Sequence, residues 1–141
     1  MTVCIDTNTV LQARSTRHRF GVILDSFAAG KFAWAVSPRI LWEYEEIIGG
    51  LAGVRHWSHL LLFMQAVNRR HRNFRIEDPW YEFRVVSADP DDNAFTDCAI
   101  CAHADYVITE DRHFAPLANA GYKPQPITPD EFIARYRGVY V

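Results

Sequence analysis

Short apolar runs that end in acidic residues constrain the fold of this chain more than any other feature. Thr2–Ile5 is a continuous run rich in β-branched residues that stops at Asp6, and residues 106–109 form a second run that ends at Glu110 and Asp111. Continuous apolar runs of this length are typical of strands buried on both faces, as in a parallel sheet. The sequence therefore predicts a parallel sheet with acids at the ends of two strands.

Helical patterns alternate with these and other short runs. We expect helices over residues 20–29, 38–50, 54–70, 93–104 and from 129 onward, and further strands over 32–36, around 83–85 and near Ile127. Strands that alternate with helices indicate β–α–β crossovers and a sheet covered on both faces, which is the α/β class. The 141 residues, 49% of them hydrophobic, can bury one sizeable core. We expect a single domain over residues 1–141.

Composition limits the cellular compartments and the kinds of partner expected for this chain. The formal net charge of −2 gives no overall attraction to nucleic acid or to an anionic membrane, so contact with a polyanion must come from local patches. The first residues show neither a basic leader nor an apolar stretch long enough for a membrane span. Three cysteines do not form a disulfide framework and suit a reducing compartment. We expect a cytoplasmic protein with no membrane partner.

The acids that follow the strands are the candidate chemical groups. In open parallel sheets the binding crevice lies beyond the carboxyl ends of the strands, where Asp6 and Asp111 are expected to meet. We expect a third acid, Asp92, from the helix that opens after residue 92. A fourth is expected from the helix over residues 38–50, in which Glu43 and Glu45 both flank the apolar face and Glu46 points nearly opposite. Periodicity alone leaves Glu43 and Glu45 as alternatives.

Clustered carboxylates imply a bound cation. Neighbouring carboxylates raise one another's pKa unless a cation compensates their charge. Ligands that are all oxygen favour Mg²⁺ or Mn²⁺, which also bind phosphates. The implied chemistry is phosphoryl transfer by metal-activated water, with either one or two cations.

Several separated motifs resemble those of PIN-domain ribonucleases, in particular the group regarded as toxins of toxin–antitoxin systems. The resemblance extends over nearly the whole chain, and its motifs occur in the family's order. The motifs are Val3-Cys4-Ile5-Asp6-Thr7-Asn8, Ser37-Pro38-Arg39-Ile40-Leu41-Trp42-Glu43-Tyr44, Asp89-Pro90-Asp91-Asp92-Asn93, Thr109-Glu110-Asp111-Arg112-His113-Phe114 and Ile127-Thr128-Pro129-Asp130-Glu131-Phe132.

The resemblance implies an α/β/α sandwich around a parallel sheet and a four-acid Mg²⁺ or Mn²⁺ site that hydrolyses single-stranded RNA. The matching acids are Asp6, Glu43, Asp92 and Asp111, which serve as both catalytic residues and metal ligands, and the resemblance thereby selects Glu43 over Glu45. Asn8 and Thr109 match small polar residues that support the acids. An antitoxin partner and a homodimer are further implications. Whether Asp91 or Asp97 also contributes stays open.

Basic residues offer a local contact for RNA. Arg14, Arg17 and Arg19 follow the Asp6 strand and are the candidate RNA-binding residues, although a solvated basic loop explains them as well. His113 lies two residues after Asp111, where it either contacts substrate or has a surface role.

Two other functions compete with a nuclease. One is a non-catalytic interaction module with the same fold. The other is an aspartyl-phosphate receiver, which fits less well because the apolar strand expected before its lysine does not precede Lys123.

Overall fold

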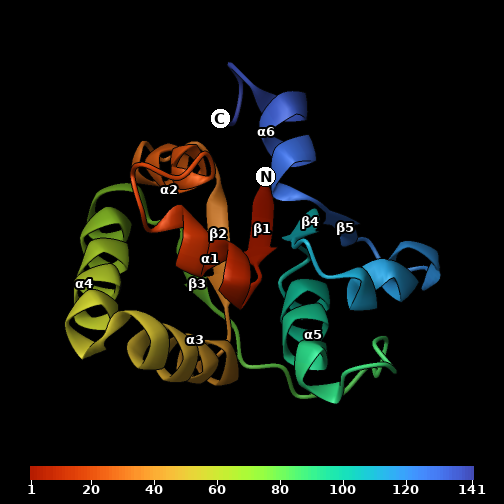
Figure 1. Cartoon of the computed structure of the whole chain (residues 1–141). Coiled ribbons are helices and arrows are strands. Elements are labelled where there is room, and N and C mark those ends of the chain that lie inside the picture. Colours follow the sequence, from red (N-terminus) through yellow and green to blue (C-terminus); the bar gives the residue numbers. More distant parts are fainter.

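The chain folds around a five-stranded sheet in which every strand pair is parallel. The computed structural model describes all 141 residues, and Figure 1 shows the arrangement. The strand order is β3-β2-β1-β4-β5. The strands are β1 (Thr2–Ile5), β2 (Ala33–Val36), β3 (Phe74–Ile76), β4 (Tyr106–Ile108) and β5 (Gln125–Ile127). The predicted parallel α/β sheet is therefore confirmed.

Helices follow the strands along the chain. They are α1 (Thr7–Ala13), α2 (Gly21–Ala28), α3 (Pro38–Ala52), α4 (Val54–His71), α5 (Asn93–Cys101) and α6 (Pro129–Tyr136), with 3₁₀ helices η1 (Pro90–Asp92) and η2 (Arg112–Asn119). In Figure 1, α1 to α4 gather on the side of β1 to β3, and α5 lies across from them. None of the helices is both long and apolar enough to cross a membrane.

The helices cover both faces of the sheet, which makes three layers. Val3 pairs with Trp34 in the register of β1 and β2, so these two side chains share one face and Cys4 points to the other. Phe27 of α2 packs on Trp34 with ring centroids 5.4 Å apart. Cys98 of α5 contacts Cys4 from the opposite side. The structure is thus the expected α/β/α sandwich.

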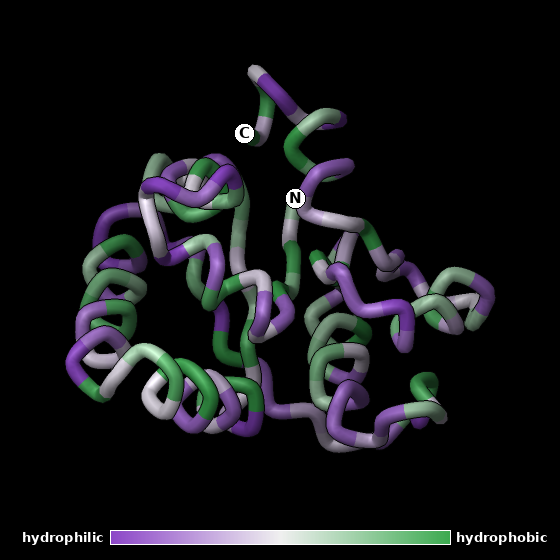
Figure 2. The backbone as a smooth tube through the Cα atoms, in the orientation of Figure 1, coloured by the Kyte–Doolittle hydropathy of each residue, from purple (hydrophilic) through white to green (hydrophobic).

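The outer helices are amphipathic, with one face packed on the sheet and the other in solvent. The central strands β1 and β2 are almost entirely buried, whereas α3 buries only Ile40, Tyr44 and Ile48 along one face. Figure 2 shows the consequence as hydrophobic and hydrophilic colours alternating along the turns of α3 and α4. A one-sided apolar face of this kind draws a helix onto the sheet while its charged face stays in water.

The strand predicted around residues 83–85 is wrong. The third strand is instead β3, which follows α4 after only two residues because Arg72 takes a left-handed conformation (φ 51°) that ends the helix. The side chain of Asn73 donates to the carbonyls of Phe27 and Phe32, which fixes the entry of β3 beside β2. Residues around 83–85 lie outside the sheet, and the backbone N–H of Phe83 donates to Asp97 of α5.

Other expectations differ from the structure mainly at boundaries. The helix expected over residues 93–104 ends at Cys101, while the strand near Ile127 is confirmed as β5. The final helix begins with the capping box of Thr128 and Glu131. Two short helices, α1 and η2, were not predicted; each begins directly after an acid that caps it, Asp6 and Asp111.

Candidate metal centre at the carboxyl edge of the sheet

Asp6 stands where β1 ends and α1 begins. Its backbone N–H extends the pairing with β4 by donating to the carbonyl of Ile108 at 3.0 Å. Its side chain caps α1, with Oδ1 accepting from the N–H of Thr7 at 2.8 Å, and Oδ2 accepts from the hydroxyl of Thr109 at 2.8 Å. Asp6 is only 7% exposed. Two donors therefore hold this buried carboxylate in one orientation.

Glu43 reaches the same place from α3. The hydroxyl of Thr7 donates to Oε2 of Glu43 at 2.9 Å. Because the backbone N–H of Thr7 donates to Asp6, Thr7 links these two acids. The neighbouring Tyr44 is fully buried and donates its hydroxyl to the carbonyl of Ile5. This contact fastens α3 to the end of β1, which places Glu43 beside Asp6.

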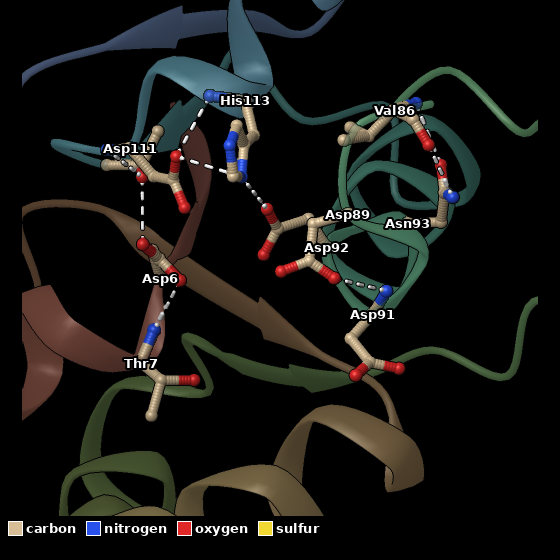
Figure 3. Close-up of polar contacts among 10 residues, drawn as sticks. Asp6, Thr7, Val86, Asp89, Asp91, Asp92, Asn93, Asp111 and His113 are labelled. Carbon is tan, nitrogen blue, oxygen red and sulfur yellow. Dashed lines mark hydrogen bonds and ion pairs between the residues drawn. The ribbon is translucent and has the colours of Figure 1, made fainter.

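Asp111 follows β4 and begins η2. Its backbone N–H donates to Thr109 Oγ1 at 2.9 Å, and the same hydroxyl donates to Asp6. Thr109 is 4% exposed, so its hydroxyl links the ends of β1 and β4 inside the protein. Asp111 Oδ1 accepts from the N–H of His113 at 2.9 Å. Figure 3 shows Asp6 and Asp111 beside one another across these contacts.

Asp92 arrives from the start of α5 and has a different environment. The side chain of Asn93 bonds both the N–H and the carbonyl of Val86, which holds the preceding loop against the helix. Asp89 accepts from the N–H of Asp91 at 3.1 Å and so caps η1. Asp92 itself is 8% exposed, and its Oδ2 is buried without a hydrogen-bond partner.

The acids influence one another's pKa, which shows that they form one electrostatic cluster. Burial raises the pKa of Asp6, the donors Thr109 and Thr7 lower it, and the charge of Asp111 raises it. Burial likewise raises the pKa of Glu43, with a contribution from the charge of Asp6.

The rise in pKa is largest at Asp92. Burial, followed by the charges of Asp111, Asp6 and Asp89, raises its pKa from 3.8 to about 7, and His113 opposes this shift. The carboxylates thus repel one another where they meet.

The residues present suit a divalent cation. A buried carboxylate oxygen without a donor is costly unless something positive faces it, and neighbouring carboxylates add repulsion. The oxygens of Asp6, Glu43, Asp92 and Asp111 are the hard ligands that Mg²⁺ and Mn²⁺ prefer. The orphaned Oδ2 of Asp92 is the observation that most favours a cation here.

The alternative acids lie away from the cluster or have another role. Glu45 and Glu46 are exposed on α3. Asp91 is exposed and pairs with Arg39 at 3.5 Å, and Figure 3 shows its carboxylate turned away from Asp92. Asp97 is buried, but it accepts from the N–H of Phe83 and so holds the loop before η1.

The supporting residues expected from the sequence have different positions. Thr109 contacts two of the acids, as described above. Asn8 is exposed in the first turn of α1, and its side chain forms no hydrogen bond within the chain. Thr7, which the sequence analysis did not single out, instead supplies the polar contacts to Asp6 and Glu43. Its position directly after a strand-ending acid was the available signal.

The candidate RNA-binding arginines lie in the exposed segment from the end of α1 to α2. Arg14 and Arg17 are exposed and form no ion pair. Arg19 pairs with Asp130 of α6 at 2.8 Å and stacks over the ring of Phe20 at 4.8 Å. The structure therefore leaves two of the three cations free of a protein partner.

A comparison with protein families gives one match. The model described as the PIN domain matches residues 2–113, a span that contains all four acids and His113. The chain belongs to the PIN-domain family. PIN domains are generally metal-dependent nucleases, which agrees with acids gathered at the carboxyl edge of the sheet. The match ends before β5 and α6, so it does not include the resemblance noted at residues 127–132. Neither the curated proteins nor the solved structures gave a match.

Proposed function

We propose that this PIN domain is an endoribonuclease that hydrolyses single-stranded RNA with Mg²⁺ or Mn²⁺. The observation that carries the proposal is the convergence of Asp6, Glu43, Asp92 and Asp111 from four separate segments on one place, with Asp92 Oδ2 left without a donor. Membership of a family of metal-dependent nucleases supports it.

The chain's own groups orient the site before substrate arrives. The hydroxyls of Thr7 and Thr109 each donate to an acid, so the carboxylates of Glu43 and Asp6 keep their positions without the cost of ordering them at each turnover. Bound there, a divalent cation supplies an activated water molecule and neutralises charge that develops on the phosphate. Asp111, with 35% of its side chain accessible, is more exposed than Asp6 and would border the approach of the substrate.

Free positive charge supports contact with the RNA backbone. Arg14 and Arg17 would bind phosphates in the segment after α1, and Arg19 would join them when its pair with Asp130 opens. Phosphate contacts make binding depend on salt in proportion to their number. The salt dependence of RNA affinity should therefore become shallower when Arg14 and Arg17 are replaced by Gln.

The test of the activity uses two glutamates on one helix. We expect wild-type protein with Mn²⁺ to cut a single-stranded RNA and to spare a DNA of the same sequence. Glu43→Gln should lower the rate by about 10²–10³-fold, the range found when one preorganised group is removed from an active site. Glu45→Gln, an equal charge change on the exposed side of α3, should keep the rate. Equal rates in both variants would contradict the assignment, and no cleavage by wild type would favour a non-catalytic interaction module.

The biological role that we propose is that of the toxin in a toxin–antitoxin pair, acting in the cytoplasm as a homodimer that a cognate antitoxin protein inhibits. The resemblance of the motifs to that group supports this role. Induced expression of the wild-type chain should arrest bacterial growth, and expression of Asp6→Asn should not. Growth arrest by both proteins would contradict a toxic nuclease activity, and a single-chain mass in solution would contradict the dimer.

A further inference from the structure

One of the four acids belongs to a second group of three side chains that the proposed function does not use in full. They are Asp89, Asp92 and His113, and one ligand atom from each lies within 4.8 Å of the others. Two of them come from the segment that leads into α5, and His113 comes from η2, which follows β4. Figure 3 shows the carboxylate of Asp92 between the imidazole of His113 and the carboxylate of Asp89.

The contacts within this group are too long to satisfy it. His113 Nδ1 lies 3.7 Å from Asp92 Oδ2, within ion-pair range but beyond hydrogen-bond distance, and that oxygen is buried without a hydrogen-bond partner. Asp92 is 8% exposed, so water does not readily compensate the missing donor. A divalent cation facing this oxygen would supply the positive partner that the protein does not.

Asp89 and His113, the two residues beside Asp92, are held in place by contacts with residues outside the group. Asp89 Oδ1 accepts from the N–H of Asp91, which leaves its second oxygen free. The backbone N–H of His113 donates to Asp111, which fixes the start of η2, and the imidazole Nδ1 lies 3.4 Å from Asp111 Oδ1. Potential ligand atoms are therefore positioned without bonding to one another.

The donor set differs from that of the four acids. Carboxylate oxygens suit Mg²⁺ and Mn²⁺, whereas an imidazole nitrogen shifts preference toward transition metals. Mn²⁺ accepts both kinds of donor. We propose that Asp89, Asp92 and His113 bind a divalent transition-metal ion, with Mn²⁺ favoured over Mg²⁺, at a position that adjoins the one bounded by Asp6 and Asp111 and shares Asp92 with the four-acid site. The inference deepens the proposed function and rests on it for its role in the reaction.

The direct test is pulsed electron paramagnetic resonance of Mn²⁺ titrated into the wild-type protein. A nitrogen coupling to the bound ion is expected, because His113 is the histidine in the group. His113→Gln should abolish that coupling. Both His113→Gln and Asp89→Asn should weaken Mn²⁺ binding at this position by more than about tenfold, since loss even of outer partners of a metal costs roughly 10–100-fold. Asn can still accept from the N–H of Asp91, so Asp89→Asn keeps the cap of η1.

Two controls match these changes. Asp91→Asn removes the same charge from the same turn, but its carboxylate points elsewhere, so the nitrogen coupling should persist. His59→Gln removes an exposed imidazole from α4 and should likewise change nothing. Circular dichroism of each variant shows whether it is folded, and a folded His113→Gln that keeps the coupling overturns the proposal.

The outcomes separate this inference from the proposed function. Cleavage of RNA that depends on metal, without any nitrogen coupling over the whole titration, overturns the His113 site alone. A nitrogen coupling that disappears in His113→Gln supports the site even if wild type cuts no RNA, a result that would contradict only the nuclease. Equal Mn²⁺ affinity in wild type and Asp89→Asn also overturns the proposal.

Discussion

Replacing Asp92 by Asn should make the metal-free protein more stable at alkaline pH. Burial and the charges of Asp111, Asp6 and Asp89 raise the pKa of Asp92 to about 7, from 3.8 in the unfolded chain. A raised pKa means that folding favours the protonated form. The stability that this form contributes is fully present below about pH 4 and is lost as pH rises through about 7. Asn resembles the protonated acid at every pH.

The size of the effect follows from the shift. About three pKa units correspond to about 4 kcal/mol. The side chain of Asp92 is 12% exposed, but that of its neighbour His113 is 49% exposed. Because water beside the cluster screens the charges, we take about half, or about 2 kcal/mol at pH 8. For a chain of this size that raises Tm by roughly 6 °C. At pH 5 wild-type Asp92 is already largely protonated in the fold, so the advantage of Asn falls below about 1 kcal/mol.

Thermal unfolding at pH 5 and pH 8 in the presence of a chelator measures this difference. Asp91→Asn is the control, because it removes the neighbouring exposed charge and should move Tm little at either pH. Added Mn²⁺ should raise Tm of the wild type more than that of Asp92→Asn, since the cation would compensate the charge that Asn lacks. A variant less stable than wild type at pH 8, or an equal advantage at both pH values, would refute the reasoning.

Three further changes test the contacts that build the site. Thr109→Val removes the hydroxyl that serves Asp6, and urea unfolding should show a loss of about 1–3 kcal/mol, with weaker Mn²⁺ binding by calorimetry. Tyr44→Phe should cost about 1–2 kcal/mol by the same method and reduce RNA cleavage, because α3 loses its bond to the end of β1. Asn93→Ala releases both bonds to Val86, so hydrogen exchange should rise in residues 83–89, and unchanged exchange would contradict the role given to Asn93.

Much of the site was predictable because parallel strands bring their carboxyl ends to one edge. Asp6 and Asp111 each follow an apolar run, and these runs became the neighbouring strands β1 and β4. The choice between Glu43 and Glu45 was not available from periodicity, because both flank the apolar face of α3. A tertiary contact distinguishes them: Thr7 donates to Glu43, while Glu45 is exposed.

Other features depended on contacts that no local pattern reveals. Phe83 and Val85 alternate as a strand would, yet the side chain of Asp97 binds the backbone of Phe83 and replaces the pairing of a sheet. Likewise, the grouping of Asp89 with His113 joins residues from two segments, which meet only when α5 packs beside β4 and η2 packs beside β5. A single acid in a turn gives no sign of such a partner.

Cleavage of a mixed pool of single-stranded RNA tests the central claim most directly, with Mn²⁺, with Mg²⁺ and with chelator, by wild type, Asp6→Asn and Asp25→Asn. Asn can still accept from Thr7 and Thr109, so Asp6→Asn should stay folded while losing a ligand charge. Asp25 is exposed on α2 and serves as the matched control. The account predicts metal-dependent cleavage by wild type and Asp25→Asn, and none by Asp6→Asn. Equal cleavage by all three proteins, or cleavage that persists with chelator, would contradict it.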